Sequence, residues 1–284
     1  MSFWDHLEEL RWMLFRIIIA LVIFAVGAFI IMPWFFSTVI LGPTKPDFFL
    51  YTMMCSLSQK ISFLPDLCDF TTQAEMINID LTAQFFRHLS TSGYLALVVI
   101  CPYILFEVWK FISPALYEHE KKNIRWVFLF GSIMFFIGCF FGYALIFPMA
   151  FNFLYKYDIS GGVIKNIIDL SYYLDIFLAL VLVMGLVFEM PLISWLLSQI
   201  GILKKSFFKK YRRHAIVILV IAAAIITPTA DPFNLSLVFL PMYALYELSI
   251  FLVKKDPVED EDEEEEEEKK KKKKKKKSKV KVKK

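Results

Sequence analysis

Six apolar segments run through this chain and leave few folds open to it. Hydrophobic residues make up 57% of its 284 positions, and the mean hydropathy is +0.55. A soluble core cannot hide that much apolar surface, so the composition predicts an all-α integral membrane protein. The predicted spans are Ile17–Phe36, Gly93–Val108, Trp126–Phe147, Tyr172–Leu197, Ala215–Ile226 and Leu235–Val253. The fifth would cover only about 18 Å as a helix, so we expect the last two to form a shallow hairpin that reverses at the proline-containing turn 227–232.

Basic residues between the spans predict the orientation. With the N-terminus inside, 14 Lys and Arg residues fall on the inner side and five fall outside. The positive-inside rule therefore places both termini in the cytoplasm, N-in and C-in. The chain divides into a cytoplasmic amphipathic helix (1–16), a six-span membrane domain (17–253) and a charged tail (254–284). The tail joins an acidic block to a lysine block, and is either a solvated extension or a segment that binds anionic lipid or a partner.

The first residues predict a helix of their own. Ser2 and Asp5 have the spacing of a helix-capping pair, and the apolar side chains that follow recur on one face. Acidic side chains, Glu9 among them, lie off that face. An acidic helix at the membrane interface suggests a docking surface, although the residues alone do not identify the ligand.

Four carboxylates lie within or at the ends of predicted spans: Glu107, Asp175, Glu189 and Glu247. An ionised acid in a membrane is costly unless it is hydrated, paired or protonated. Because no Lys or Arg lies deep in any predicted span, we expect Glu107 to snorkel beside Lys110 and Asp175 to be interfacial. Glu189 lies deeper, two residues before Pro191, and is predicted to be functional. Glu247 is either a snorkelling acid or part of a polar cavity.

The cysteines and histidines predict no metal or cofactor. Cys55 and Cys68 share the long external loop and form either a disulfide or two free thiols, whereas Cys101 and Cys139 lie in spans. The sequence has no Cys/His cluster with metal-ligand spacing, no glycine-rich loop that would bind a nucleotide, and no nucleophile–base pattern that would indicate an enzyme.

A proton-coupled transporter that uses Glu189 and Glu247 is the alternative function, but the internal repeats typical of that class are missing.

Several motifs together resemble the TatC family, the C subunit of the twin-arginine translocase. They are Ser2-Phe-x-x-His-Leu-x-Glu-Leu-Arg11, Pro102-x-x-Leu-Phe-Glu-Val-Trp-x-Phe111, Pro114-Ala-Leu-Tyr-x-His-Glu120, Gly138-x-x-Phe-x-Tyr-x-x-x-x-Pro148, Phe188-Glu-x-Pro191 and Thr227-Pro-x-x-Asp-Pro-Phe233. The resemblance runs in order from Ser2 to about Val253.

This resemblance implies a receptor for signal peptides with paired arginines, in a pathway that moves folded proteins across the bacterial cytoplasmic (inner) membrane on the proton gradient. It implies a cup-shaped fold, and it implies that Glu9 and Glu120 bind the arginines with Phe111 beside them. Glu189, and with it Glu247, would meet a polar group of a small single-span partner of the TatA/TatB type. Membrane lipid and further copies of this chain are the other expected partners, and nucleic acid is not. Structural roles are expected for the remaining motif residues: Arg11, Pro102, Pro114, Tyr143, Pro148 and Asp231.

Overall fold

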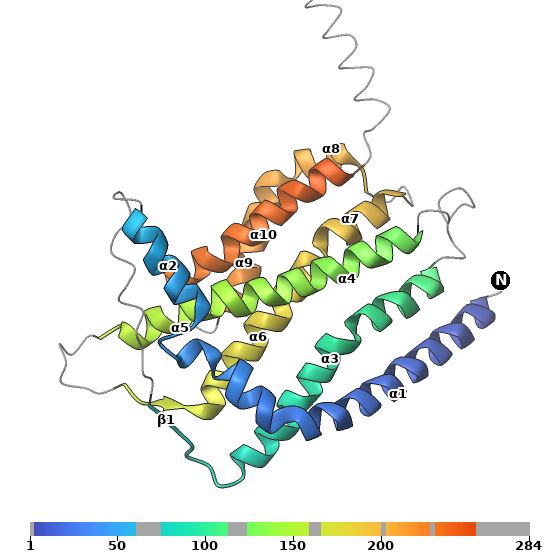
Figure 1. Cartoon of the computed structure of the whole chain (residues 1–284). Helices are drawn as coiled ribbons and strands as arrows, with labels where there is room; N and C mark the ends of the chain where they lie inside the picture. Colours follow the sequence, from blue (N-terminus) through green and yellow to red (C-terminus); the bar gives the residue numbers. More distant parts are fainter. Residues whose placement is uncertain are drawn as a thin grey trace, which may run out of the picture. The chain divides into compact units, whose positions relative to one another are not determined.

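The computed structural model is helical, apart from one short pair of strands (Figure 1). It describes residues 3–60, 75–112, 124–158, 166–199, 203–227 and 231–253. The longer helices are α1 (Phe3–Phe35), α2 (Phe49–Lys60), α3 (Ala83–Ile112), α4 (Ile124–Phe141), α5 (Phe147–Lys156), α6 (Leu170–Phe188), α7 (Met190–Gln199), α9 (Arg212–Ile226) and α10 (Pro232–Leu252). The short elements are η1 (Phe36–Ile40), η2 (Gly42–Thr44), β1 (Met76–Ile77), η5 (Gly142–Ile146), β2 (Ile168–Asp169) and α8 (Lys205–Lys210).

Two compact units make up the chain. The first comprises residues 1–189 and 220–242, and the second comprises residues 190–219 and 243–284. The first unit holds α1 to α6 and the candidate site described below. Within the second unit, the Tyr246 hydroxyl donates to the Phe208 carbonyl at 2.9 Å, which ties the end of α10 to α8.

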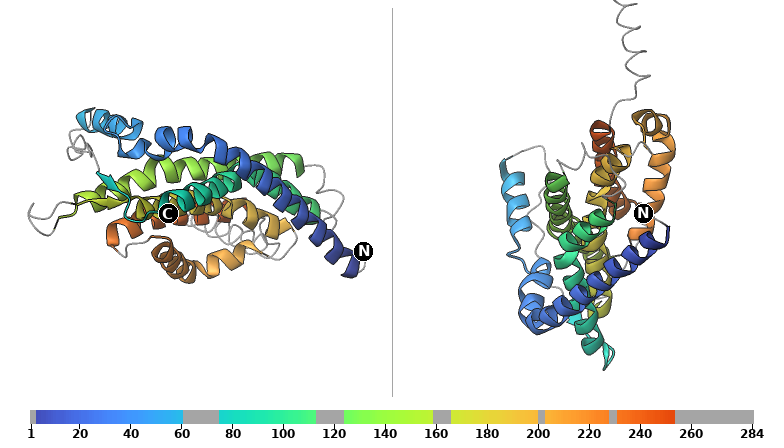
Figure 2. Two further views of the ribbon diagram at one scale, coloured as in Figure 1. Left: turned by 90° about the horizontal axis from the view of Figure 1, so that it is seen from below. Right: turned by 90° about the vertical axis from the view of Figure 1, so that its right-hand side faces the viewer.

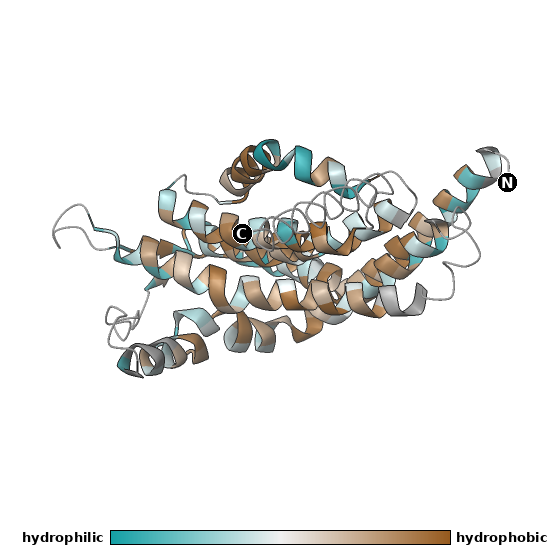
Figure 3. Ribbon diagram, turned by 90° about the horizontal axis from the view of Figure 1, so that it is seen from above, coloured by the Kyte–Doolittle hydropathy of each residue, from teal (hydrophilic) through white to brown (hydrophobic). Residues whose placement is uncertain are grey.

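Five segments of the described chain are long and apolar enough to cross a membrane. They are His6–Met53, Ala83–Phe111, Leu129–Lys156, Leu170–Ser198 and Pro232–Leu252. Five of the six predicted spans lie largely within these segments, so the hydropathy pattern was a sound guide to them. The remaining prediction, Ala215–Ile226, lies in α9, a 15-residue helix about 22 Å long. Hydrophobic residues cover most of the helical ribbon, while hydrophilic residues gather in the first turns of the chain (Figure 3).

The first helix differs from the prediction, because the polar segment and the first span are one continuous helix, α1, of 33 residues. Gly27 is its first glycine and Pro33 its only proline, so nothing in the sequence breaks the helix at residue 16. α1 runs along α3 in each view (Figures 1 and 2).

Pro33 leaves a free carbonyl on α1 that α3 satisfies. Proline has no N–H for the carbonyl four residues earlier, which belongs to Phe29. His88 of α3 donates its Nε2–H to that oxygen at 2.9 Å and stacks on the Phe29 ring with 3.9 Å between centroids. A polar cross-link thus joins α1 and α3 in a region where bare carbonyls are costly.

Glycines bring α4 and α6 together. A Cβ at Gly138 would lie 2.6 Å from the Met184 carbonyl oxygen, and one at Gly185 would lie 2.6 Å from the Cys139 sulfur. Small residues of this kind let membrane helices pack backbone against backbone, where apolar burial contributes little.

Tyrosines satisfy the irregular backbone after α1. Tyr143 donates to the Val39 carbonyl at 3.0 Å and Tyr173 to the Ile40 carbonyl at 2.6 Å. Tyr51 likewise donates to the Pro43 carbonyl at 2.8 Å. The motif residue Tyr143 therefore holds the turn that follows the first span.

Three other motif residues also have structural surroundings. Pro148 is buried at the start of α5, which continues directly from η5, and Pro102 lies inside α3. Asp231 accepts the backbone N–H of Asn234 at 2.8 Å and thereby caps α10.

The long loop between the first two spans, which is predicted to be external, is only partly described. Its residues Met76 and Ile77 pair in parallel with Ile168 and Asp169, which joins β1 to β2. Cys55 lies in α2, but Cys68 falls outside the described residues, so the disulfide stays a prediction. The charged tail 254–284 lies outside them as well.

Candidate functional site

The beginning of α1 and the end of α3 meet at one place in the first unit. The His6 ring of α1 stacks on the Phe111 ring of α3, with 4.2 Å between centroids and 19° between planes. These residues belong to two motifs that are about a hundred positions apart in the sequence. The fold thus brings the acidic N-terminal segment beside Phe111, the aromatic residue at the end of the second motif.

Glu9 lies on the face of α1 that contacts α3. His6, Glu9, Met13 and Arg16 recur at intervals of three and four, which places them on one side of a helix. His6 and Arg16 both contact α3, and Met13 is buried, so this side faces α3. Glu9 is partly exposed there, while Glu8 and Arg11 are exposed. Glu120 and Pro114 fall outside the described residues, and the position of Glu120 relative to Glu9 stays a prediction.

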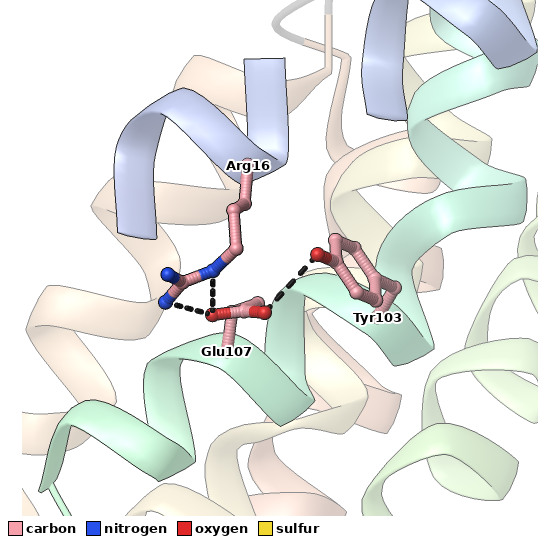
Figure 4. Close-up of polar contacts among 3 residues, drawn as sticks. All are labelled: Arg16, Tyr103 and Glu107. Carbon is pink, nitrogen blue, oxygen red and sulfur yellow. Dashed lines mark hydrogen bonds and ion pairs between the residues drawn. The ribbon is translucent and has the colours of Figure 1, made fainter. Parts of the chain in front are cut away.

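Glu107 lies in the same seam, the contact between α1 and α3, and two side chains bind it (Figure 4). Arg16 donates from Nε at 3.0 Å and from Nη2 at 2.7 Å, both to Oε2. The Tyr103 hydroxyl donates to the other oxygen, Oε1, at 3.1 Å. We expected Lys110 beside Glu107, but the partner in the structure is Arg16, which belongs to another helix and lies 91 positions away in the sequence.

Arginines also neutralise two of the other predicted membrane acids. Arg87 binds Asp175 through two parallel contacts, one of them 2.9 Å from Nη2 to Oδ2. In the second unit, Arg212 donates to Glu247 at 2.7 Å and Tyr243 donates to it at 2.9 Å. The sequence did not identify these arginines as partners, because neither lies deep in a predicted span. Arginines placed near span ends reach the acids of neighbouring helices.

Glu189 differs from these three acids. It occupies the turn between α6 and α7, so the predicted fourth span is two consecutive helices rather than one. Pro191, the second residue of α7, has no N–H to continue the hydrogen bonds of α6. The Glu189 side chain is only 4% exposed, and neither carboxylate oxygen has a hydrogen-bond partner among the described residues. An acid this buried is costly unless it is hydrated, paired or protonated.

The comparisons with known proteins identify a family for this chain. The sequence model of the Sec-independent protein translocase protein (TatC) family matches residues 5–241. The chain belongs to the TatC family. A TatC of Blattabacterium sp. subsp. Periplaneta americana (strain BPLAN) is 34% identical over 257 residues, which cover 89% of this chain and 94% of that protein. A TatC of Koribacter versatilis (strain Ellin345) is 32% identical, over 88% of this chain and 84% of its own length.

A solved structure agrees with the family assignment. The crystal structure of a twin-arginine translocase receptor, TatC, superposes with a TM-score of 0.71 at 28% identity, covering 88% of this chain and 99% of that one. Together with the five apolar segments, the family makes this chain a multi-pass membrane protein of a protein translocase. The transporter alternative is not favoured, and its second relay acid, Glu247, is occupied by Arg212 and Tyr243.

Sequence reasoning missed His6 and Arg16 as contact residues. His6 stands in the first motif, but only the fold shows that its ring covers Phe111. The position of Arg16 could have indicated its role. It is a charged residue at the start of an apolar stretch, seven positions after Glu9, and a charge there is expected to pair with a carboxylate on a neighbouring helix.

Proposed function

We propose that this chain is the receptor subunit of a twin-arginine translocase, which binds signal peptides with paired arginines and recruits small single-span subunits. The meeting of α1 and α3 carries the proposal, since the stack of His6 on Phe111 brings the helix face that holds Glu9 to the end of α3. Carboxylates match the planar fork of a guanidinium, and an aromatic ring offers a face on which the cation can lie. Glu120, in the segment that follows α3, supplies the second carboxylate in this proposal.

The proposed topology has six spans, with α9 as the short fifth, and both termini in the cytoplasm of a bacterial inner membrane. The bias of basic residues to the predicted inner loops supports it. In this orientation, the start of α1 and the end of α3 face the cytoplasm, where signal peptides arrive. Lipid and further copies of this chain complete the proposed complex.

Photo-crosslinking tests the place of binding. A photoreactive residue at Lys110, exposed beside Phe111, should crosslink to an Arg-Arg signal peptide and much less to its Lys-Lys counterpart. The same probe at Leu81, 98% exposed before the other end of α3, should crosslink to neither. Glu120→Lys should abolish the product at position 110 while the protein still inserts into membranes. Undiminished crosslinking in Glu120→Lys would contradict the site.

Glu189 is the proposed docking point for the small subunits. Its oxygens lack a partner among the described residues, whereas Glu107, Asp175 and Glu247 each have an arginine. A polar side chain on a partner's helix would satisfy Glu189, and such hydrogen bonds associate helices in membranes.

Co-purification tests the docking point. Glu189→Ala should reduce the co-purified TatA/TatB-type subunits by about tenfold, a loss of about 1.4 kcal/mol, and leave peptide binding intact. Asp175→Asn is the matched control, because it changes an acid that Arg87 already occupies. Unchanged subunits in Glu189→Ala would exclude the assignment.

A further inference from the structure

We propose that Arg16 and Glu107 form a clamp that holds Glu9 and Phe111 at the spacing that paired arginines require. Both are positioning residues, since neither contacts the peptide in this proposal. The inference rests on the proposed function, because it concerns the same site.

The contacts leave Glu107 closed to an incoming arginine. Two nitrogens of Arg16 occupy Oε2, the Tyr103 hydroxyl occupies Oε1, and the Glu107 side chain is 5% exposed. Glu107 is therefore not a third acid for the ligand, although it lies four residues from Phe111. Its carboxylate is committed to joining α1 and α3.

The clamp lies close to the residues that it would position. Glu107 is about 6 Å along α3 from Phe111, and Arg16 is about 10 Å along α1 from Glu9. Farther out, the His6 ring stacks on the Phe111 ring and joins the same two helices. The clamp lies one turn inside that stack along α3 and ten residues, about 15 Å, inside it along α1, and it limits how far the ends of the two helices can separate.

A membrane gives polar contacts this positioning role. Lipid tails solvate apolar side chains as well as a neighbouring helix does, so apolar seams alone set the register of two helices weakly. A charged pair has one geometry at which both groups are satisfied. Arginine supplies two donors in a rigid fork, and lysine supplies a single point of charge. Arg16→Lys should therefore loosen the clamp without removing the charge.

The test measures selectivity, which a merely stabilising contact would not change. The full chain is purified into lipid nanodiscs, and its affinities for Arg-Arg and Lys-Lys signal peptides are compared. Arg16→Gln/Glu107→Gln, which removes both charges together, should lower the Arg-Arg affinity by about tenfold and the Lys-Lys affinity much less. The charge swap Arg16→Glu/Glu107→Arg should restore the ratio to within about threefold of the unmodified chain.

The Arg87–Asp175 pair provides the matched control. It also joins α3 to a neighbour through an arginine and a carboxylate, but it lies near the other end of α3. Arg87→Gln/Asp175→Asn should keep the selectivity ratio, whatever its effect on thermal stability. If the control pair lowers the ratio as much as the clamp pair, the positioning role is wrong.

The remaining outcomes separate the clamp from the receptor role. A folded Arg16→Gln/Glu107→Gln variant with the original ratio overturns the clamp, and so does a folded charge swap that restores nothing. If the double variant does not fold, Arg16→Lys replaces it, and an unchanged ratio there overturns the clamp as well. An unmodified chain that does not distinguish the two peptides instead contradicts the proposed function.

Discussion

At the scale of single residues, arginine decides what each membrane carboxylate can do. Arg16, Arg87 and Arg212 each neutralise one acid of another helix. Both oxygens of each carboxylate are hydrogen-bonded, either to two nitrogens of the arginine or to the arginine and a tyrosine hydroxyl. These acids hold helices together and are not free to bind ligands. Glu189 is the acid whose oxygens have no such partner in the described chain, which makes it the best candidate for an intermolecular contact.

The sequence could not reveal these pairs. Arg16 and Glu107 are 91 positions apart, and Arg87 and Asp175 are 88 apart, so local spacing favoured Lys110 as the partner of Glu107. Helix packing determines which long side chains meet, and hydropathy carries no information about it. The sequence did show which carboxylates lie in or beside apolar spans and therefore need a partner, water or a proton.

His88 offers a test at this scale. His88→Phe keeps a ring on Phe29 but removes the donor for the Phe29 carbonyl, which Pro33 leaves unsatisfied. We expect a loss of about 1–3 kcal/mol in the free energy of unfolding, the cost of an unpaired buried acceptor. Denaturant unfolding in detergent measures it. The exposed His214, which contacts Tyr211 through its ring, gives the control His214→Phe with little change; equal losses would contradict the role of His88.

At the scale of elements, the apolar segments were predictable and their irregular joints were not. Hydropathy placed five segments because a membrane-crossing helix needs about 20 apolar residues. The break at Glu189 lies beside Pro191, whereas the turn after α1 depends on tertiary contacts. Tyr143 and Tyr173 satisfy the carbonyls of that turn from distant helices, so no local pattern announces it.

The glycine contact between α4 and α6 gives a prediction for elements. Gly138→Ala would place a Cβ against the Met184 carbonyl and Phe188, so the helices must separate. We expect a loss of about 1–3 kcal/mol, as for other overpacked sites. Gly27→Ala in α1 is the control, because nothing lies within 4 Å of its Cβ and alanine favours a helix. Thermal unfolding of both variants compares them, and a neutral Gly138→Ala would show that the contact is loose.

At the scale of the whole molecule, folding brings together residues of the candidate site that are far apart in the sequence. Glu9 and Phe111 lie in segments that the sequence separates by two spans and a long loop, and the stack of His6 on Phe111 brings those two segments together. Motif resemblance named the residues, and family membership is now established. The fold adds the helices that carry Glu9 and Phe111 and the ion pair that joins those helices.

The most direct test of the receptor role is the affinity of the purified chain in lipid nanodiscs for an Arg-Arg signal peptide and for its Lys-Lys counterpart. We predict that the Arg-Arg peptide binds at least about tenfold more tightly. Glu9→Lys should abolish this preference, and Glu8→Lys, at the exposed neighbouring position, should keep it. Equal affinity for the two peptides, or an unchanged preference in Glu9→Lys, would contradict the account.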